Sequence, residues 1–88
     1  MTTQFNFGKA LDLLKSGLRV TRAGWNGKGL SVALQAPDAH SKMTRPYFYL
    51  ITPAASTRQF GVAGETQQCV PWLPSQTDLL ADDWELVE

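Results

Sequence analysis

The sequence predicts one α+β domain, mainly an antiparallel β-sheet, with a helix before the sheet and a short helix near the C-terminus. Two observations indicate this class. The segment 5–17 places its apolar residues at helical spacing. The segments 18–25, 30–36 and 47–52 are short, and they alternate or are rich in aromatic and β-branched residues. Turn and loop residues, rather than helices, separate these segments, so an antiparallel sheet is expected.

The N-terminal helix is predicted over FNFGKALDLLKSG (5–17). Asn6 is a suitable N-cap, and Gly17 is suited to the left-handed position that follows a helix. Positions i, i+3, i+4 and i+7 form one apolar stripe, made of Phe7, Ala10, Leu11 and Leu14. Such a stripe predicts that one face of the helix packs on the sheet.

The first two strands are predicted to form a hairpin. LRVTRAGW (18–25) alternates and then bends near Ala23 and Gly24. Asn26-Gly27 favours a tight turn, because both positions tolerate a positive φ. LSVALQA (30–36) is then the returning strand.

The second half of the chain is predicted to complete the sheet. YFYLIT (47–52) is the third strand, QFGVAG (59–64) is a short or irregular strand, and ETQQCVPW (65–72) runs extended. Pro71 cannot donate to a ladder, so this last strand either lies at an edge or ends at Val70. The Ser75–Asp78 spacing is that of a capping box, so a short helix should follow, and the final strand holds Trp84, Leu86 and Val87.

Length and composition indicate a single domain over residues 1–88. The hydrophobic fraction is 43% and the charged fraction is 18%, which is typical of a globular chain with few surface charges. A chain this short buries only about 60–65% of its unfolded surface, so we expect a homo-oligomer. Neither a secretory signal nor an apolar run of membrane-spanning length is visible, so a soluble protein of the cytoplasm is expected.

The net charge is zero but unevenly distributed. Residues 1–58 contain eight cations and two acids, a net charge of +6, whereas residues 59–88 contain six acids and no cation, a net charge of −6. Two interpretations stay open: charge complementarity within one fold, or an anion site built from the first part of the chain. A net charge of zero argues against general nucleic-acid binding.

Few residues suit catalysis, so no enzymatic activity is expected. The chain has one histidine, His40 in a polar loop, and one cysteine, Cys69, which is most simply a buried structural residue. The acids Asp78, Asp82 and Asp83 are too few, with one His and one Cys, for a convincing metal site. NGKG lacks the other residues of a phosphate-binding P-loop. We therefore expect no metal and no cofactor.

Aromatic rings beside glycine are the more informative feature. Trp84, in an alternating strand, is predicted to lie in the core, whereas Trp72 suits either the core or a pocket wall. Trp25 precedes Asn-Gly, away from the periodic core faces, so its ring either fills a gap in the core or stacks on a flat ligand. Arg22 or Lys28 would then meet phosphates nearby.

Two motifs occurring together suggest a family. RAGWNGKG (22–29) follows the helix FGKALDLLKSG (7–17), and VPWLPSQTDLLADDWELVE (70–88) closes the chain. This pairing resembles a family of small phage and prophage proteins, the Thoeris anti-defence proteins of the second type. The resemblance covers residues 5–34 and 70–88, whereas residues 35–69 carry no matching motif.

The resemblance implies a non-enzymatic sponge acting in the cytoplasm of the infected bacterial host. Members of this family bind cyclic ADP-ribose isomers made by Thoeris TIR proteins and withhold them from the effector. Some members also hold cyclic oligonucleotides at a separate site. The family is α+β and oligomeric, typically tetrameric, with pockets at subunit contacts. The alternatives are an enzyme that cleaves the same signal, or a structural module that uses Trp25 as a protein contact.

The resemblance also implies a ligand site. The Trp25 ring would stack on a base, and neighbouring residues of the same turn would line the pocket. The C-terminal motif would add polar contacts. The expected ligand-binding residues are Arg22, Trp25, Asn26, Gly27, Lys28, Trp72, Gln76, Thr77 and Asp78.

Overall fold

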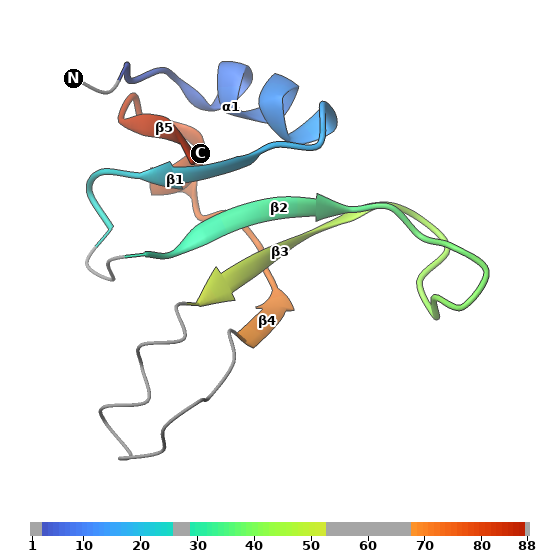
Figure 1. The fold of residues 1–88 in the computed structure, drawn as a ribbon. Helices are drawn as coiled ribbons and strands as arrows, with labels where there is room; N and C mark the ends of the chain where they lie inside the picture. Colours follow the sequence, from blue (N-terminus) through green and yellow to red (C-terminus); the bar gives the residue numbers. More distant parts are fainter. Residues whose placement is uncertain (1–2, 26–28, 53–67, 88) are drawn as a thin grey trace, which may run out of the picture.

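The computed structural model describes residues 3–25, 29–52 and 68–87 as an α+β fold, with one five-stranded antiparallel sheet and two helices (Figure 1). The order of strands across the sheet is β4-β3-β2-β1-β5. The elements in chain order are α1 (Phe7–Lys15), β1 (Arg19–Arg22), β2 (Ser31–Gln35), β3 (Tyr47–Thr52), β4 (Gln68–Pro71), α2 (Gln76–Leu79) and β5 (Trp84–Val87). The predicted fold class and the order of its described elements are confirmed.

Helix α1 forms as its local sequence predicts. The side chain of Asn6 accepts a hydrogen bond from the backbone N–H of Lys9, and Gly17 adopts a φ of 91° just after the helix. Ala10 and Leu14 are buried against the sheet. Phe7 and Leu13 pack against the core, so the predicted stripe holds at Phe7, Ala10 and Leu14, with Leu13 in the place expected for Leu11.

The two strands of the predicted first hairpin are confirmed. β1 and β2 are antiparallel, with Val20 opposite Val32. The chain leaves β1 at Arg22 and turns at residues 23–24, where a bend was predicted. The predicted Asn26-Gly27 turn lies outside the described residues.

The β4 strand lies at one edge of the sheet. It pairs with β3, with Leu50 opposite Val70 and Tyr49 opposite Pro71. An edge strand tolerates proline, so the interpretation of this segment as an edge strand is confirmed. The strand predicted over 59–64 lies outside the described residues. Cys69 in β4 is exposed, so the expectation that it is buried was wrong.

The C-terminal motif forms a short helix and the opposite edge of the sheet. The Ser75 side chain accepts from the backbone N–H of Asp78, and the Asp78 side chain accepts from the backbone N–H of Ser75. The predicted capping box is therefore present. β5 pairs with β1, which places Trp84 opposite Arg22.

The core lies between α1 and the sheet. It consists of fully buried Ala10, Leu14, Val20, Val32 and Trp84. Trp84 has no exposed surface, so the prediction that it is a core residue is confirmed. Among the residues that the structure describes, no helix is long and apolar enough to cross a membrane.

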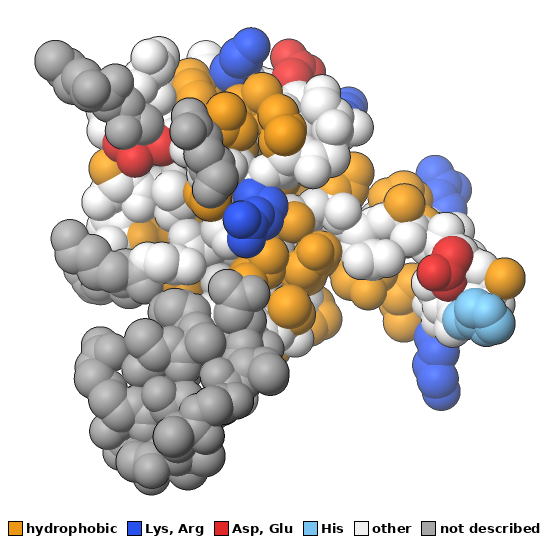
Figure 2. All heavy atoms as spheres, viewed as in Figure 1, with side chains coloured by type: hydrophobic (Ala, Val, Ile, Leu, Met, Phe, Trp, Pro, Cys, Tyr) orange, Lys and Arg blue, Asp and Glu red, His pale blue; other side chains and the backbone are white. Residues whose placement is uncertain are grey.

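The segment between β2 and β3 projects from the sheet and carries many of the polar groups. Figure 2 shows Lys, Arg, acidic and His side chains on this projection. Asp38 accepts hydrogen bonds from the backbone N–H of His40 and the hydroxyl of Ser41, so its carboxylate stabilises the local turn. The prediction that His40 lies in a polar loop is thus confirmed.

Candidate ligand-binding site

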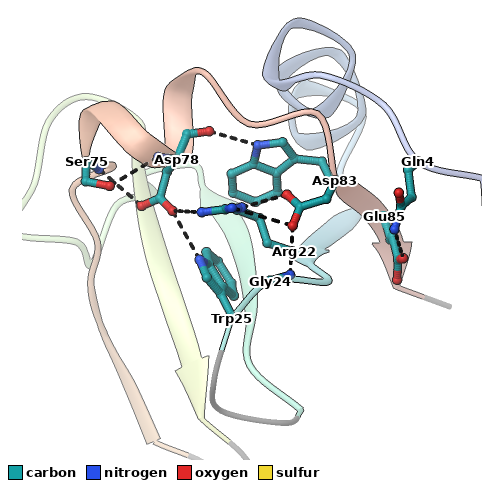
Figure 3. Close-up of polar contacts among 9 residues, drawn as sticks. Gln4, Arg22, Gly24, Trp25, Ser75, Asp78, Asp83 and Glu85 are labelled. Carbon is teal, nitrogen blue, oxygen red and sulfur yellow. Dashed lines mark hydrogen bonds and ion pairs between the residues drawn. The ribbon is translucent and has the colours of Figure 1, made fainter.

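Arg22 lies at the end of β1 between two carboxylates of the C-terminal motif (Figure 3). Its Nε donates to Oδ1 of Asp83 at 2.8 Å, and its Nη1 donates to Oδ1 of Asp78 at 2.9 Å. Only 14% of the Arg22 side chain is exposed. One cation and two carboxylates leave this cluster with a formal charge of −1, so Arg22 is a poor attractor of phosphate in this arrangement.

Trp25 packs against the core instead of lying apart from it. Its ring meets Trp84 at a centroid distance of 5.4 Å and Trp72 at 6.2 Å, both edge-to-face. The indole Nε1 donates to Oδ1 of Asp78 at 3.1 Å. The expectation that Trp25 sits away from the core faces was therefore wrong. Trp25 as a residue is partly exposed.

Asp78 accepts hydrogen bonds from four other residues of the site. Its Oδ1 accepts from Arg22 and Trp25, and its Oδ2 accepts from the backbone N–H of Ser75. Its backbone carbonyl accepts from Nε1 of Trp84 at 2.9 Å. The residue is nearly buried, and satisfied hydrogen bonds compensate a buried carboxylate for its lost water.

Asp83 is a site residue that the sequence analysis missed, because it was considered there only as a metal ligand. Its Oδ1 binds Arg22, and its Oδ2 accepts from the backbone N–H of Gly24 at 2.7 Å. The backbone N–H of Ala23 also donates to the Asp83 carbonyl. The available signal was its place directly before the strand of Trp84, since that strand pairs with the strand of Arg22.

Both carboxylates favour their charged forms. Burial raises the pKa of Asp78, but hydrogen bonds from Trp25, Arg22 and Ser75 outweigh burial and lower it overall from 3.8. The hydrogen bond from Arg22 lowers the pKa of Asp83, and the Gly24 amide lowers it further. A lowered folded-state pKa contributes stability that is present above about pH 3.8 and is lost as pH falls through the lowered values.

A pocket lies elsewhere on the sheet. It has a volume of about 280 Å³ and is lined by Gln35, Tyr47, Tyr49, Cys69, Val70 and Pro71. Tyr47 and Tyr49 alternate along β3 with Phe48 and Leu50, which pack on the core, so this pocket opens on the opposite face. None of the predicted ligand residues lines it.

Comparison with known proteins decides the family. The model of the Thoeris anti-defense 2-like domain matches residues 5–87. This chain belongs to the Thoeris anti-defense 2-like family. It is also 38% identical over 89 residues to Thoeris anti-defense 2 from Bacillus phage SP01, and the match covers 99% of each chain. The family suggested by the two sequence motifs is thus confirmed.

In this Thoeris anti-defense 2-like chain, four predicted ligand residues lie together. They are Arg22, Trp25, Trp72 and Asp78. Gln76 and Thr77 are exposed on α2, directly before Asp78. Asn26, Gly27 and Lys28 lie outside the described residues. Of the groups sought for catalysis, His40 lies in the projecting loop and Cys69 on β4, whereas Asp78 and Asp83 bind Arg22.

Among the described residues, no group of three or more His, Cys, Asp or Glu side chains is arranged to hold a metal ion. Asp78 and Asp83 use their oxygens on Arg22, Trp25 and backbone N–H groups. The site of this family member therefore offers a partly exposed tryptophan and an exposed polar helix face.

Proposed function

We propose that this protein binds a cyclic ADP-ribose-type immune signal and sequesters it without cleaving it, and so blocks activation of the Thoeris effector. Membership of the Thoeris anti-defense 2-like family supports a role against Thoeris during phage infection. The protein would then act in the cytoplasm of the infected bacterium. Other cyclic nucleotides are further candidate ligands.

The observation that carries this proposal is the ring of Trp25, a partly exposed residue. Its inner edges pack on Trp72 and Trp84, and Asp78 holds its indole N–H, so the ring is fixed before any ligand arrives. A fixed ring loses little freedom on binding, and stacking on a base contributes about 1–3 kcal/mol. Gln76 and Thr77 supply exposed donors and acceptors beside Asp78.

Sequestration is tested by recovering the ligand. The protein is incubated with glyco-cyclic ADP-ribose, which is one of the cyclic ADP-ribose isomers. It is then washed free of unbound ligand and heated. A sponge releases the intact molecule, which mass spectrometry detects at its original mass. Release of a linear product would show an enzyme instead, and no binding by calorimetry would favour the structural module.

Replacement of Trp25 by alanine should weaken ligand capture. Loss of stacking predicts a loss of about 1–3 kcal/mol in binding free energy, which calorimetry with glyco-cyclic ADP-ribose measures. Since the ring also packs on the core, Leu13→Ala is the matched control: Leu13 packs on the same core from α1, beyond the other end of β1. If both variants bind equally well, or if Trp25→Ala unfolds, the stacking role is wrong.

We further propose a homo-oligomer, most simply a tetramer, whose ligand pockets draw on two chains. Large apolar side chains are exposed on both sides of α2, where Leu73 is 89% exposed and Leu80 is 80% exposed. Apolar surface of this kind favours association, and α2 also carries Gln76 and Thr77.

Light scattering should therefore give a mass several times the 9.7 kDa of one chain. Added ligand should raise the melting temperature of the assembly, because a ligand that binds only the folded form stabilises it by mass action. Leu80→Glu, which places charge in the exposed apolar surface, should lower the mass. A monomer that still binds glyco-cyclic ADP-ribose tightly would refute the shared pocket.

A further inference from the structure

Three successive residues before Trp25 are bound to one aspartate. Arg22 donates through Nε to Oδ1 of Asp83 at 2.8 Å, and Gly24 donates through its backbone N–H to Oδ2 at 2.7 Å. Between them, the backbone N–H of Ala23 donates to the Asp83 carbonyl at 3.0 Å. Each of the three residues before Trp25 is thus hydrogen-bonded to Asp83, and Figure 3 shows the bonds from Arg22 and Gly24.

Gly24 is needed for this attachment because of space. A Cβ built at Gly24 would lie 2.7 Å from Oδ2 of Asp83, closer than such atoms approach in real structures. The absence of a side chain therefore lets the carboxylate reach the backbone N–H. The short contact ties the position of the chain directly before Trp25 to the position of the Asp83 carboxylate.

The Trp25 ring is consequently held from two sides. Its indole N–H is bound by Asp78, and its backbone follows Gly24, which is bound by Asp83. The backbone N–H of Trp25 also donates to the Arg22 carbonyl at 3.3 Å. Arg22 bridges the two carboxylates, so displacement of either acid changes the restraint on the ring.

We propose that Asp83 is a positioning residue of the ligand site: through Gly24 and Arg22 it sets the placement of the Trp25 ring, without touching the ligand. This inference rests on the proposed function of Trp25. Both Asp83 oxygens are occupied by protein donors, and a carboxylate repels the phosphates of a nucleotide. Both facts argue against a direct contact between Asp83 and the ligand.

The test is Asp83→Asn, which keeps the size of the side chain. The amide has one oxygen for two donors, so its NH₂ group must face either the Arg22 guanidinium or the Gly24 N–H. In NMR spectra recorded without ligand, the resonances of the Trp25 indole N–H and the Gly24 amide should therefore shift. The Trp84 indole resonance should shift less, because its acceptor, the Asp78 carbonyl, is unchanged and only the neighbouring Trp25 ring moves. Affinity for glyco-cyclic ADP-ribose should fall at least tenfold.

Two controls separate positioning from general effects. Asp12→Asn removes an equal charge from the exposed side of α1, and Leu13→Ala lowers stability away from the turn. Both should retain wild-type affinity and the Trp25 indole resonance. The inference would be overturned if the Trp25 and Gly24 resonances were unchanged in Asp83→Asn. It would also be overturned if Asp83→Asn lost no more affinity than Leu13→Ala.

A second variant tests the same contact from the other side. Gly24→Ala keeps both charges but pushes the Asp83 carboxylate away from the backbone, so it should reproduce the Trp25 shift and the affinity loss. A Gly24→Ala protein with wild-type spectra and affinity would also refute positioning. If the wild-type protein fails to bind glyco-cyclic ADP-ribose, the proposed function falls, whereas the ligand-free resonances still decide whether Asp83 positions Trp25.

Discussion

Replacement of Trp84 by alanine should unfold the domain or leave it barely stable. The side chain is fully buried and its ring contacts Phe7, Trp25 and Trp72 at centroid distances of 5.3–6.1 Å. Deleting a buried tryptophan costs about 3–5 kcal/mol, which rivals the whole stability of a domain at the low end of the usual range. Urea denaturation followed by circular dichroism measures the loss.

The matched control for this variant is Leu80→Ala, because Leu80 is also a large apolar residue of the C-terminal motif but is 80% exposed. Its free energy of unfolding should change little if the protein is compared at a concentration where assembly is unaffected. A soluble Trp84→Ala protein with near wild-type stability would show that β5 is peripheral to the fold.

Replacement of Asp78 by alanine should cause the second large loss, about 2–4 kcal/mol of unfolding free energy. The change leaves the Arg22 guanidinium with one carboxylate, removes the acceptor of the Trp25 indole, and ends the capping box of α2. Removing one partner of a largely buried ion pair is costly, because the other charge stays buried without compensation. Thermal or urea denaturation at pH 7 measures the loss.

Asp82→Ala is the control for this second variant. Asp82 carries the same charge four residues away and is exposed, so its loss should be small. The difference between wild type and Asp78→Ala should also shrink as pH falls from about 3.8 through the lowered folded-state pKa of Asp78, because the unfolded chain takes up the proton first. Equal losses for the two variants would show that the Asp78 contacts contribute no net stability.

Elements set by local sequence were predicted well. The helix over Phe7–Lys15 carries its apolar stripe, its N-cap and its terminal glycine within a dozen residues. Strand β3 and the Ser75 capping box depend on equally short patterns. In each case the signal lies in neighbouring residues, so no knowledge of distant contacts was needed.

The arrangement of the site was not predictable to the same degree. The packing of Trp25 and the role of Asp83 depend on the register that places Arg22 opposite Trp84. Residue patterns indicate that two strands exist, but they do not indicate which residues face one another across a sheet. Complementarity within one fold was one of the two interpretations of the charge split, and the Arg22 ion pairs are an instance of it.

The pairing of β1 with β5 has a consequence for how a newly made chain folds. The partners Arg22 and Asp83 are separated by 61 positions, and the largest core side chain, Trp84, follows directly. While a ribosome is still adding residues before this point, α1 and the first strands lack the Trp84 ring, which is the largest fully buried side chain among the described residues. Contacts between such distant segments close slowly. The core beneath α1 is therefore completed only after synthesis has passed residue 84.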